Sequence, residues 1–164
     1  MYFQQSDLLR GLDKDFVKEF MDIAEKETHK TGYALFREGD RARYFYVLLK
    51  GCVKLTIGDS GHTVYTADRS GEVFGWSSLV GRAAYTASAE CREATILLRV
   101  DVTKLNEILD KDPSTGLIFF KRLAGSLGNR LLQTYRMISS TPEMEMSRSY
   151  GTGQVMESEA GVSS

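Results

Sequence analysis

The stretch GEVFGWSSLVGRAAYTASAEC, residues 71–91, combines residue types that together suit a small anion. A polar turn follows a glycine, a strand of small residues comes later, and Arg82 lies between them. Backbone N–H groups at the start of a helical turn favour negative charge, and an arginine pairs well with phosphate oxygens. We therefore take this stretch as the candidate ligand-binding site. Its residues are Phe74, Gly75, Trp76, Ser77, Ser78, Arg82, Ala83, Ala84, Tyr85 and Thr86.

The sequence offers few residues for a metal site, a disulfide framework or a hydrolase active site. His29 and His62 are the only histidines and form no His-x-His pair, so we expect no metal site. Cys52 and Cys91 form no C-x-x-C pair, which favours two reduced thiols over a disulfide framework or a zinc site. The serines of the polar turn lack the Gly-x-Ser-x-Gly pattern of hydrolases. We expect a protein that is not an enzyme.

The bulk composition is that of an ordinary globular protein without a dominant charge. The 164 residues are 42% hydrophobic and 26% charged, and the formal net charge of -1 creates no overall field that attracts nucleic acid or membranes. The N-terminus lacks a basic start followed by an apolar run, and no segment approaches the roughly 18 apolar residues that span a bilayer. We expect a cytoplasmic protein with no membrane segment.

Hydrophobic periodicity predicts a mainly β protein with an N-terminal helix and two C-terminal helices. Apolar residues recur at three- and four-residue steps over 5–27, where Gly11 also allows two short helices. From Thr28 to Val100, short runs rich in aromatic and β-branched residues alternate with glycine turns, which predicts an antiparallel β-roll, or jelly roll. The expected strands are 29–36, 44–51, 52–58, 63–68, 85–91 and 95–100. Phe36, Phe45, Val47, Val53 and Leu55 are the expected inward-facing side chains of the roll.

Two helices are expected after the roll. Asp101 suits the N-cap of a helix over 102–112, and Pro113 marks the boundary before a longer helix over 114–138. The remaining residues, 139–164, are rich in Ser, Gly and Glu and too polar to build a core, so we expect a disordered tail. The folded domain is expected to span residues 1–138.

The helix over 114–138 carries more apolar residues than one buried face needs. One stripe follows the spacing of a coiled-coil seam, and a second set, Ile118, Leu123 and Leu132, lies partly off it. We expect the stripe to form a homodimer; the alternative is a lid over the pocket within one chain. The stripe residues are Leu117, Phe120, Ala124, Leu127, Leu131, Thr134 and Ile138.

The segment LFREGDRARYFYVLLKGCVKL, residues 35–55, resembles the first half of a cyclic-nucleotide-binding domain. That family carries a phenylalanine, a Gly-Asp turn, an aromatic-rich strand that ends in glycine, and a hairpin, here Phe36, Gly39-Asp40, 44–49, Gly51 and 53–55. The resemblance covers about residues 5–138 and implies a sensor domain like those of catabolite-activator and FNR proteins. Family members that bind DNA add a helix-turn-helix after the long helix. Only about 25 acidic and Gly/Ser-rich residues follow here, so we expect no direct DNA binding.

The resemblance also implies where the ligand lies. In the family it sits between a turn that reads Phe-Gly-Glu and a strand that begins Arg, then Ser, Thr or Ala, then Ala. Trp76 replaces the glutamate that accepts the ribose 2′-hydroxyl, and an indole N–H can only donate. Glu72 precedes the glycine, on the wrong side of the turn. Trp76 either fills the ribose half of the pocket or forms an aromatic wall for a flatter ligand.

Two registers are open for the pocket strand. Counted back from Ala89, the arginine position falls at Ala83 or Ala84, and Arg82 faces solvent. Counted forward from Arg-Ala-Ala, Arg82 matches the family's arginine, and a bulge brings its side chain into the pocket. The two registers differ physically because a shift of one residue moves side chains to the other face of the strand. We favour the first register.

Because Trp76 replaces the ribose acceptor and the favoured register turns Arg82 to solvent, we expect weak cyclic AMP binding or none. The predicted function is a sensor that binds a cyclic nucleotide or another small anion and signals through its long helix to an unidentified protein partner. The alternative is a ligand-free interaction module with a pocket filled by its own side chains.

Overall fold

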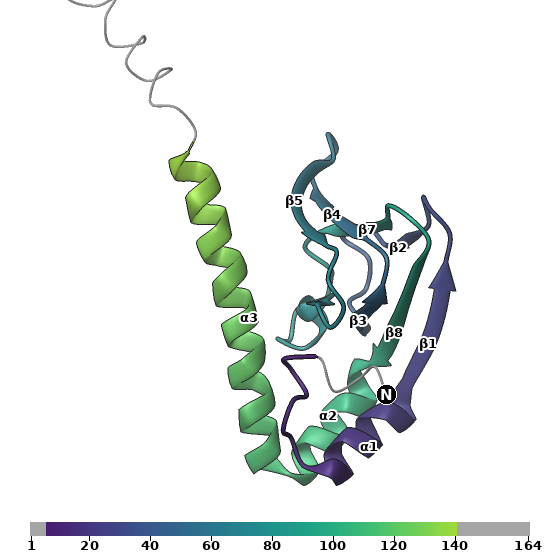
Figure 1. Ribbon diagram of the computed structural model, residues 1–164, viewed down its shortest axis with the longest axis vertical. Coiled ribbons are helices and arrows are strands. Elements are labelled where there is room, and N and C mark those ends of the chain that lie inside the picture. Colours follow the sequence, from purple (N-terminus) through teal and green to yellow (C-terminus); the bar gives the residue numbers. More distant parts are fainter. Residues whose placement is uncertain (1–5, 141–164) are drawn as a thin grey trace, which may run out of the picture. The chain divides into compact units, whose positions relative to one another are not determined.

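The computed structural model describes residues 6–140 and has two four-stranded antiparallel sheets flanked by helices (Figure 1). The strands are β1 Ala24–His29, β2 Ala34–Phe36, β3 Tyr44–Lys50, β4 Val53–Ile57, β5 His62–Ala67, β6 Val73–Phe74, β7 Ser88–Cys91 and β8 Thr95–Asp101. The helices are α1 Lys14–Ile23, the short 3-10 helix η2 Trp76–Ser78, α2 Val102–Lys111 and α3 Pro113–Ser139. One sheet has the order β1-β8-β3-β6 and the other β2-β7-β4-β5. The predicted fold class, a β-roll with one helix before it and two after it, is confirmed.

The predicted helix over 5–27 is wrong at both ends. Residues 7–11 form turns, the helix is confined to α1, and Ala24 already begins β1. β1 pairs with β8 from Ala24↔Val100 to His29↔Thr95, so the roll starts four residues before Thr28. Glutamate and lysine in this strand are good helix formers, but the neighbouring strand decides the conformation.

Two of the predicted strands are shorter than expected. The run 29–36 breaks after His29 at a turn where Gly32 has φ +83, a conformation that costs glycine little. The predicted strand 85–91 becomes regular only at Ser88, and Ala84, just before it, forms an isolated bridge with Arg41. The other four predicted strands agree with the structure within a few residues.

The predicted starts of the two C-terminal helices are confirmed to within one residue. Asp101 is the N-cap of α2, where its carboxylate accepts hydrogen bonds from the N–H groups of Thr103 at 2.9 Å and Lys104 at 3.4 Å. α3 begins at Pro113. The chain divides into two compact units, Met1–Gly128 and Asn129–Ser164, and α3 continues from the first into the second. The expected disordered tail falls almost wholly on 141–164, outside the described residues.

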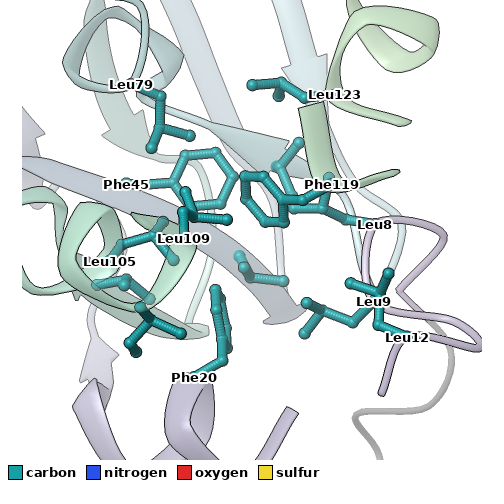
Figure 2. Close-up of a cluster of buried hydrophobic side chains, with 14 of the residues drawn as sticks. Leu8, Leu9, Leu12, Phe20, Phe45, Leu79, Leu105, Leu109, Phe119 and Leu123 are labelled. Atoms are coloured by element: carbon teal, nitrogen blue, oxygen red, sulfur yellow. The ribbon is translucent and has the colours of Figure 1, made fainter. Parts of the chain in front are cut away.

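Buried side chains form two clusters, one on each face of the β1-β8-β3-β6 sheet. The helix-side cluster packs that sheet against the helices and the N-terminal segment (Figure 2). It contains Leu8, Leu9, Leu12, Phe16, Phe20, Phe45, Val47, Val73, Leu79, Leu98, Val100, Leu105, Ile108, Leu109, Phe119 and Leu123. The inter-sheet cluster lies between the two sheets. It contains Phe36, Tyr46, Leu48, Val53, Leu55, Ala67, Phe74, Tyr85, Ala89, Cys91 and Leu97.

The expected set of inward-facing side chains divides between these clusters. Phe36, Val53 and Leu55 do lie between the sheets. Phe45 and Val47 instead face the helices, which corrects the prediction for β3. This strand is buried on both faces, so alternation in its sequence does not reveal which face lies inside the roll.

Candidate functional site

A tight turn links β6 to η2 and lies directly against β3. Gly75 has φ +77, and a Cβ atom placed on it would lie 2.9 Å from Cδ2 of Tyr46 and 3.0 Å from the carbonyl oxygen of Tyr44. Both the left-handed backbone and the close approach therefore require glycine. Residues 75–78, called the 75–78 turn below, are consequently held at a fixed distance from β3.

The two serines of the 75–78 turn are buried and satisfied within the protein. The Ser78 hydroxyl lies 2.8 Å from the carbonyl oxygen of Gly75 and 3.2 Å from that of Tyr44, and it donates to them. The Ser77 and Thr86 hydroxyl oxygens lie 3.4 Å apart. These contacts join the turn to β3 and to the segment before β7, so the serines help to hold the site together.

Before β7 begins, residues 83–85 pair with the segment that precedes β3. The N–H of Ala42 donates to the carbonyl of Ala83 at 3.0 Å, and the N–H of Tyr85 donates to that of Asp40 at 2.9 Å. Ala84 forms an isolated bridge with Arg41, and the side chain of Tyr85 lies in the inter-sheet cluster.

Arg82 lies just outside this paired segment. Its side chain is exposed, and its backbone N–H donates to the carbonyl of Ser77 at 3.1 Å. Ala83 is exposed and Ala84 is half-buried. Neither register of the pocket arginine is tested by this arrangement, and both remain predictions.

Tyr85 is buried in the candidate site and is held by several neighbouring residues. Its side chain is 4% exposed, its ring stacks on Phe36 with centroids 3.8 Å apart, and its hydroxyl bonds to the main chain of Tyr44. Burial raises the pKa of this phenol, so it stays neutral. The sequence indicated Tyr85 as a site residue but did not indicate this role. One signal was available: Tyr85 is the single aromatic residue among small ones in AAYTASA.

Trp76 and Glu72 lie on opposite sides of Gly75 in the sequence and have different environments. Trp76 is half-buried and packs against the helix-side cluster. Glu72 accepts hydrogen bonds from the Tyr65 hydroxyl and from the N–H groups of Asp68 at 2.9 Å and Arg69 at 2.8 Å. Burial raises the pKa of Glu72, but these bonds outweigh burial and lower it. The Glu72 carboxylate therefore bonds within its own loop and is not available to accept a hydrogen bond from a ribose hydroxyl.

Within residues 6–140, no group of three or more His, Cys, Asp or Glu side chains could hold a metal ion. None of the helices in that range combines the length and the apolar character needed to cross a membrane.

Residues 26–112 match the cyclic nucleotide-binding domain family. Human cGMP-dependent protein kinase 2 is 30% identical over 82 residues, which are 48% of this chain and only 11% of the kinase. The chain thus spans about a ninth of the curated relatives it matches.

Solved structures show the same fold. A Geobacter metallireducens protein described as cyclic nucleotide-binding is 26% identical with a TM-score of 0.68, over 76% of this chain and 91% of that one. A cyclic nucleotide-binding domain from Methylobacillus flagellatus has a TM-score of 0.72 at 18% identity, over 84% and 82% of the two chains. The Thermus thermophilus catabolite activator protein has a TM-score of 0.66 at 24% identity, over 82% and 62%. The chain belongs to the cyclic nucleotide-binding domain family, a class of regulatory ligand-binding domains.

Proposed function

We propose that this chain is a regulatory sensor domain that binds a small anion at the 75–78 turn and signals through α3, and that it is not itself a catalyst. The first N–H groups of a helical turn have no carbonyl partner inside the turn and favour negative charge. Gly75 sets the backbone of this turn, and η2 begins directly after it. The family match supports a ligand at this position.

The packing of Trp76 is the observation that supports a signal from the 75–78 turn to α3. Its side chain starts in the 75–78 turn and packs against the helix-side cluster, which includes Phe119 and Leu123 of α3. A ligand that shifts the turn would therefore change the packing of the cluster that holds the first part of α3. Densely packed cores transmit small displacements rather than absorbing them.

Fluorescence of Trp76 tests this proposal, because it is the single tryptophan of the chain. We expect inorganic phosphate to shift its emission and to raise the melting temperature, since a ligand of the native state adds about 2.7 kcal/mol at 100 times Kd. A Trp76→Phe control should keep the thermal shift and lose the optical signal. If phosphate, cyclic AMP and cyclic GMP all leave both signals unchanged, the sensor function is wrong.

Cyclic AMP itself should bind weakly. The ribose acceptor is replaced by Trp76, and the phosphate arginine lies at an exposed position. Loss of two charge-assisted contacts costs about 3–6 kcal/mol, which moves a micromolar site to the millimolar range or beyond. Calorimetry that gave a Kd below about 10 µM would contradict this expectation.

A second candidate function is a ligand-free interaction module. The observation that favours it is Tyr85, which fills space between Phe36 and β3 with its own side chain. In that case the inner part of the pocket is core, and the protein acts through its surface alone. The phosphate titration separates the two functions, because only the sensor responds to an added anion.

We also propose that the exposed stripe of α3 pairs two copies of the chain. Leu117, Ile118 and Phe120 are 57%, 44% and 36% exposed, whereas Phe119 and Leu123 are buried. Leu127 packs against the helix-side cluster, so the exposed Leu117 and Phe120 are better mutation sites. We expect light scattering to give twice the 18.4 kDa of one chain, and Leu117→Glu with Phe120→Glu to give the single-chain mass. A wild-type monomer would exclude the dimer.

A further inference from the structure

Tyr85 is the one large side chain on the inward face of residues 85–91. Ala87, Ala89 and Cys91 point to the same side and pack with it in or against the inter-sheet cluster. The family pattern of the pocket strand is Arg, then a small residue, then Ala. If its arginine position falls at Ala83, its alanine position falls at Tyr85. A small side chain at this position would leave open the space that the phenol ring occupies.

The ring of Tyr85 is held both by stacking and by its hydroxyl. It stacks on Phe36 with an interplanar angle of 16°. Its hydroxyl donates to the carbonyl of Tyr44 at 2.8 Å and accepts from the N–H of Tyr44 at 3.0 Å. A ligand that displaced the ring would leave these buried main-chain groups of β3 with fewer partners, which is costly.

Other aromatic rings fill the space around Tyr85. The Tyr46 ring lies against Gly75 of the 75–78 turn and stacks on Phe74, with centroids 5.2 Å apart. Its centroid lies 5.6 Å from that of Phe36. The inner side of the site is therefore lined by rings that also form the inter-sheet cluster, whereas Ala83 and Thr86 at its rim are exposed.

We propose that Tyr85 is a specificity-determining plug, which fills the inner part of the site so that it admits a small phosphate at its rim and excludes a nucleotide. The inference rests on the proposed ligand position at the 75–78 turn. It adds the size class of the ligand and names the side chain that sets it. Removing the ring opens the inner part, while removing only the hydroxyl leaves it filled.

Three variants test the plug by calorimetry with cyclic AMP, cyclic GMP and inorganic phosphate. We expect Tyr85→Ala to bind a cyclic nucleotide at least about ten-fold more tightly than wild type, because its base and ribose gain a cavity. Tyr85→Phe keeps the ring and should match wild type. Inorganic phosphate is titrated into each variant, so that loss of the whole site is distinguished from a change in the size of the ligand that it admits. Tyr85→Leu keeps apolar contact with Phe36 and replaces the alanine variant if near-UV circular dichroism shows that variant to be unfolded.

The outcomes separate the plug from the sensor function. If folded Tyr85→Ala and Tyr85→Leu bind cyclic nucleotides no better than wild type, the plug is wrong, while phosphate binding by wild type would leave the sensor function intact. Micromolar cyclic AMP binding by wild type also overturns the plug, because the ligand then enters with Tyr85 in place. If Tyr85→Ala gains cyclic nucleotide binding but wild type ignores phosphate, the plug stands and the small-anion sensor fails.

Discussion

The two faces of the β1-β8-β3-β6 sheet are buried in different ways. The helix-side cluster consists of leucine, isoleucine, valine and phenylalanine side chains and joins the sheet to α1, α2, α3 and the N-terminal segment. The inter-sheet cluster includes two tyrosines and several small residues. The candidate site contacts both, since Trp76 packs against the first and Tyr85 belongs to the second. Apolar packing thus positions the helices, and stacking with hydrogen bonds positions the site.

The largest effect should come from the helix-side cluster. Phe119 is 0% exposed and contacts Phe16 and Phe45, so Phe119→Ala should lower the free energy of unfolding by about 3–5 kcal/mol. Its neighbour Phe120 is 36% exposed, and Phe120→Ala should cost less than about 1 kcal/mol in the monomer. Urea titration of both variants measures the difference. Equal losses would mean that α3 does not pack through the Phe119 face.

A smaller effect is expected for the hydroxyl in the inter-sheet cluster. Tyr85→Phe leaves the N–H of Tyr44 without its acceptor, which should cost about 1–3 kcal/mol of unfolding free energy. The exposed Tyr33 provides a control, because Tyr33→Phe should change stability by less than about 0.5 kcal/mol. Thermal unfolding compares the two. A Tyr85→Phe variant as stable as wild type would show that stacking alone fixes the ring.

The cap of α2 should contribute less and should depend on pH. Burial raises the pKa of Asp101, but the hydrogen bonds from Arg43, Lys104 and Thr103 outweigh it and lower the pKa. A lowered carboxyl pKa stabilises the fold above the unfolded value of about 3.9, and this contribution is lost as pH falls through the folded pKa.

Asp101→Ala should therefore cost about 0.5–2 kcal/mol at neutral pH, and the difference from wild type should shrink below about pH 4. Asp110→Ala on the exposed face of the same helix is the matched control. Chemical denaturation across the pH range measures both. A cost for Asp101→Ala that stayed constant into acid would rule out the charged cap as its source.

The smallest effect should be that of Arg82, at the rim of the site. Its side chain is exposed, so Arg82→Ala should change stability by less than about 0.5 kcal/mol and leave the phosphate response intact. Arg122 is a useful contrast, because its guanidinium donates to the backbone carbonyls of Leu8 and Arg10, and its removal should cost about 1–2 kcal/mol. A clear loss of phosphate protection in Arg82→Ala would favour the register in which a bulge brings Arg82 into the pocket.

Features that depend on neighbouring residues were predicted well. The order of elements, the cap at Asp101 and the start of α3 at Pro113 follow from local backbone preferences and from hydrophobic period. The identity of Ala24–His29 as a strand was missed, because its partner β8 lies some 70 residues away and its own sequence favours a helix. Long-range pairing is not visible in a local pattern.

For the site, the sequence alone determined the residue types and the turn. It indicated that Gly75 belongs to the turn, that Trp76 replaces the family's glutamate, and that the chain resembles a cyclic-nucleotide-binding domain. Only the tertiary structure decided that Trp76 packs toward the helices, that Tyr85 lies between the sheets, and that Phe45 and Val47 face the helix side. The physical reason is that β3 is covered on both faces, so side-chain direction depends on register and on the layers above and below it rather than on residue type.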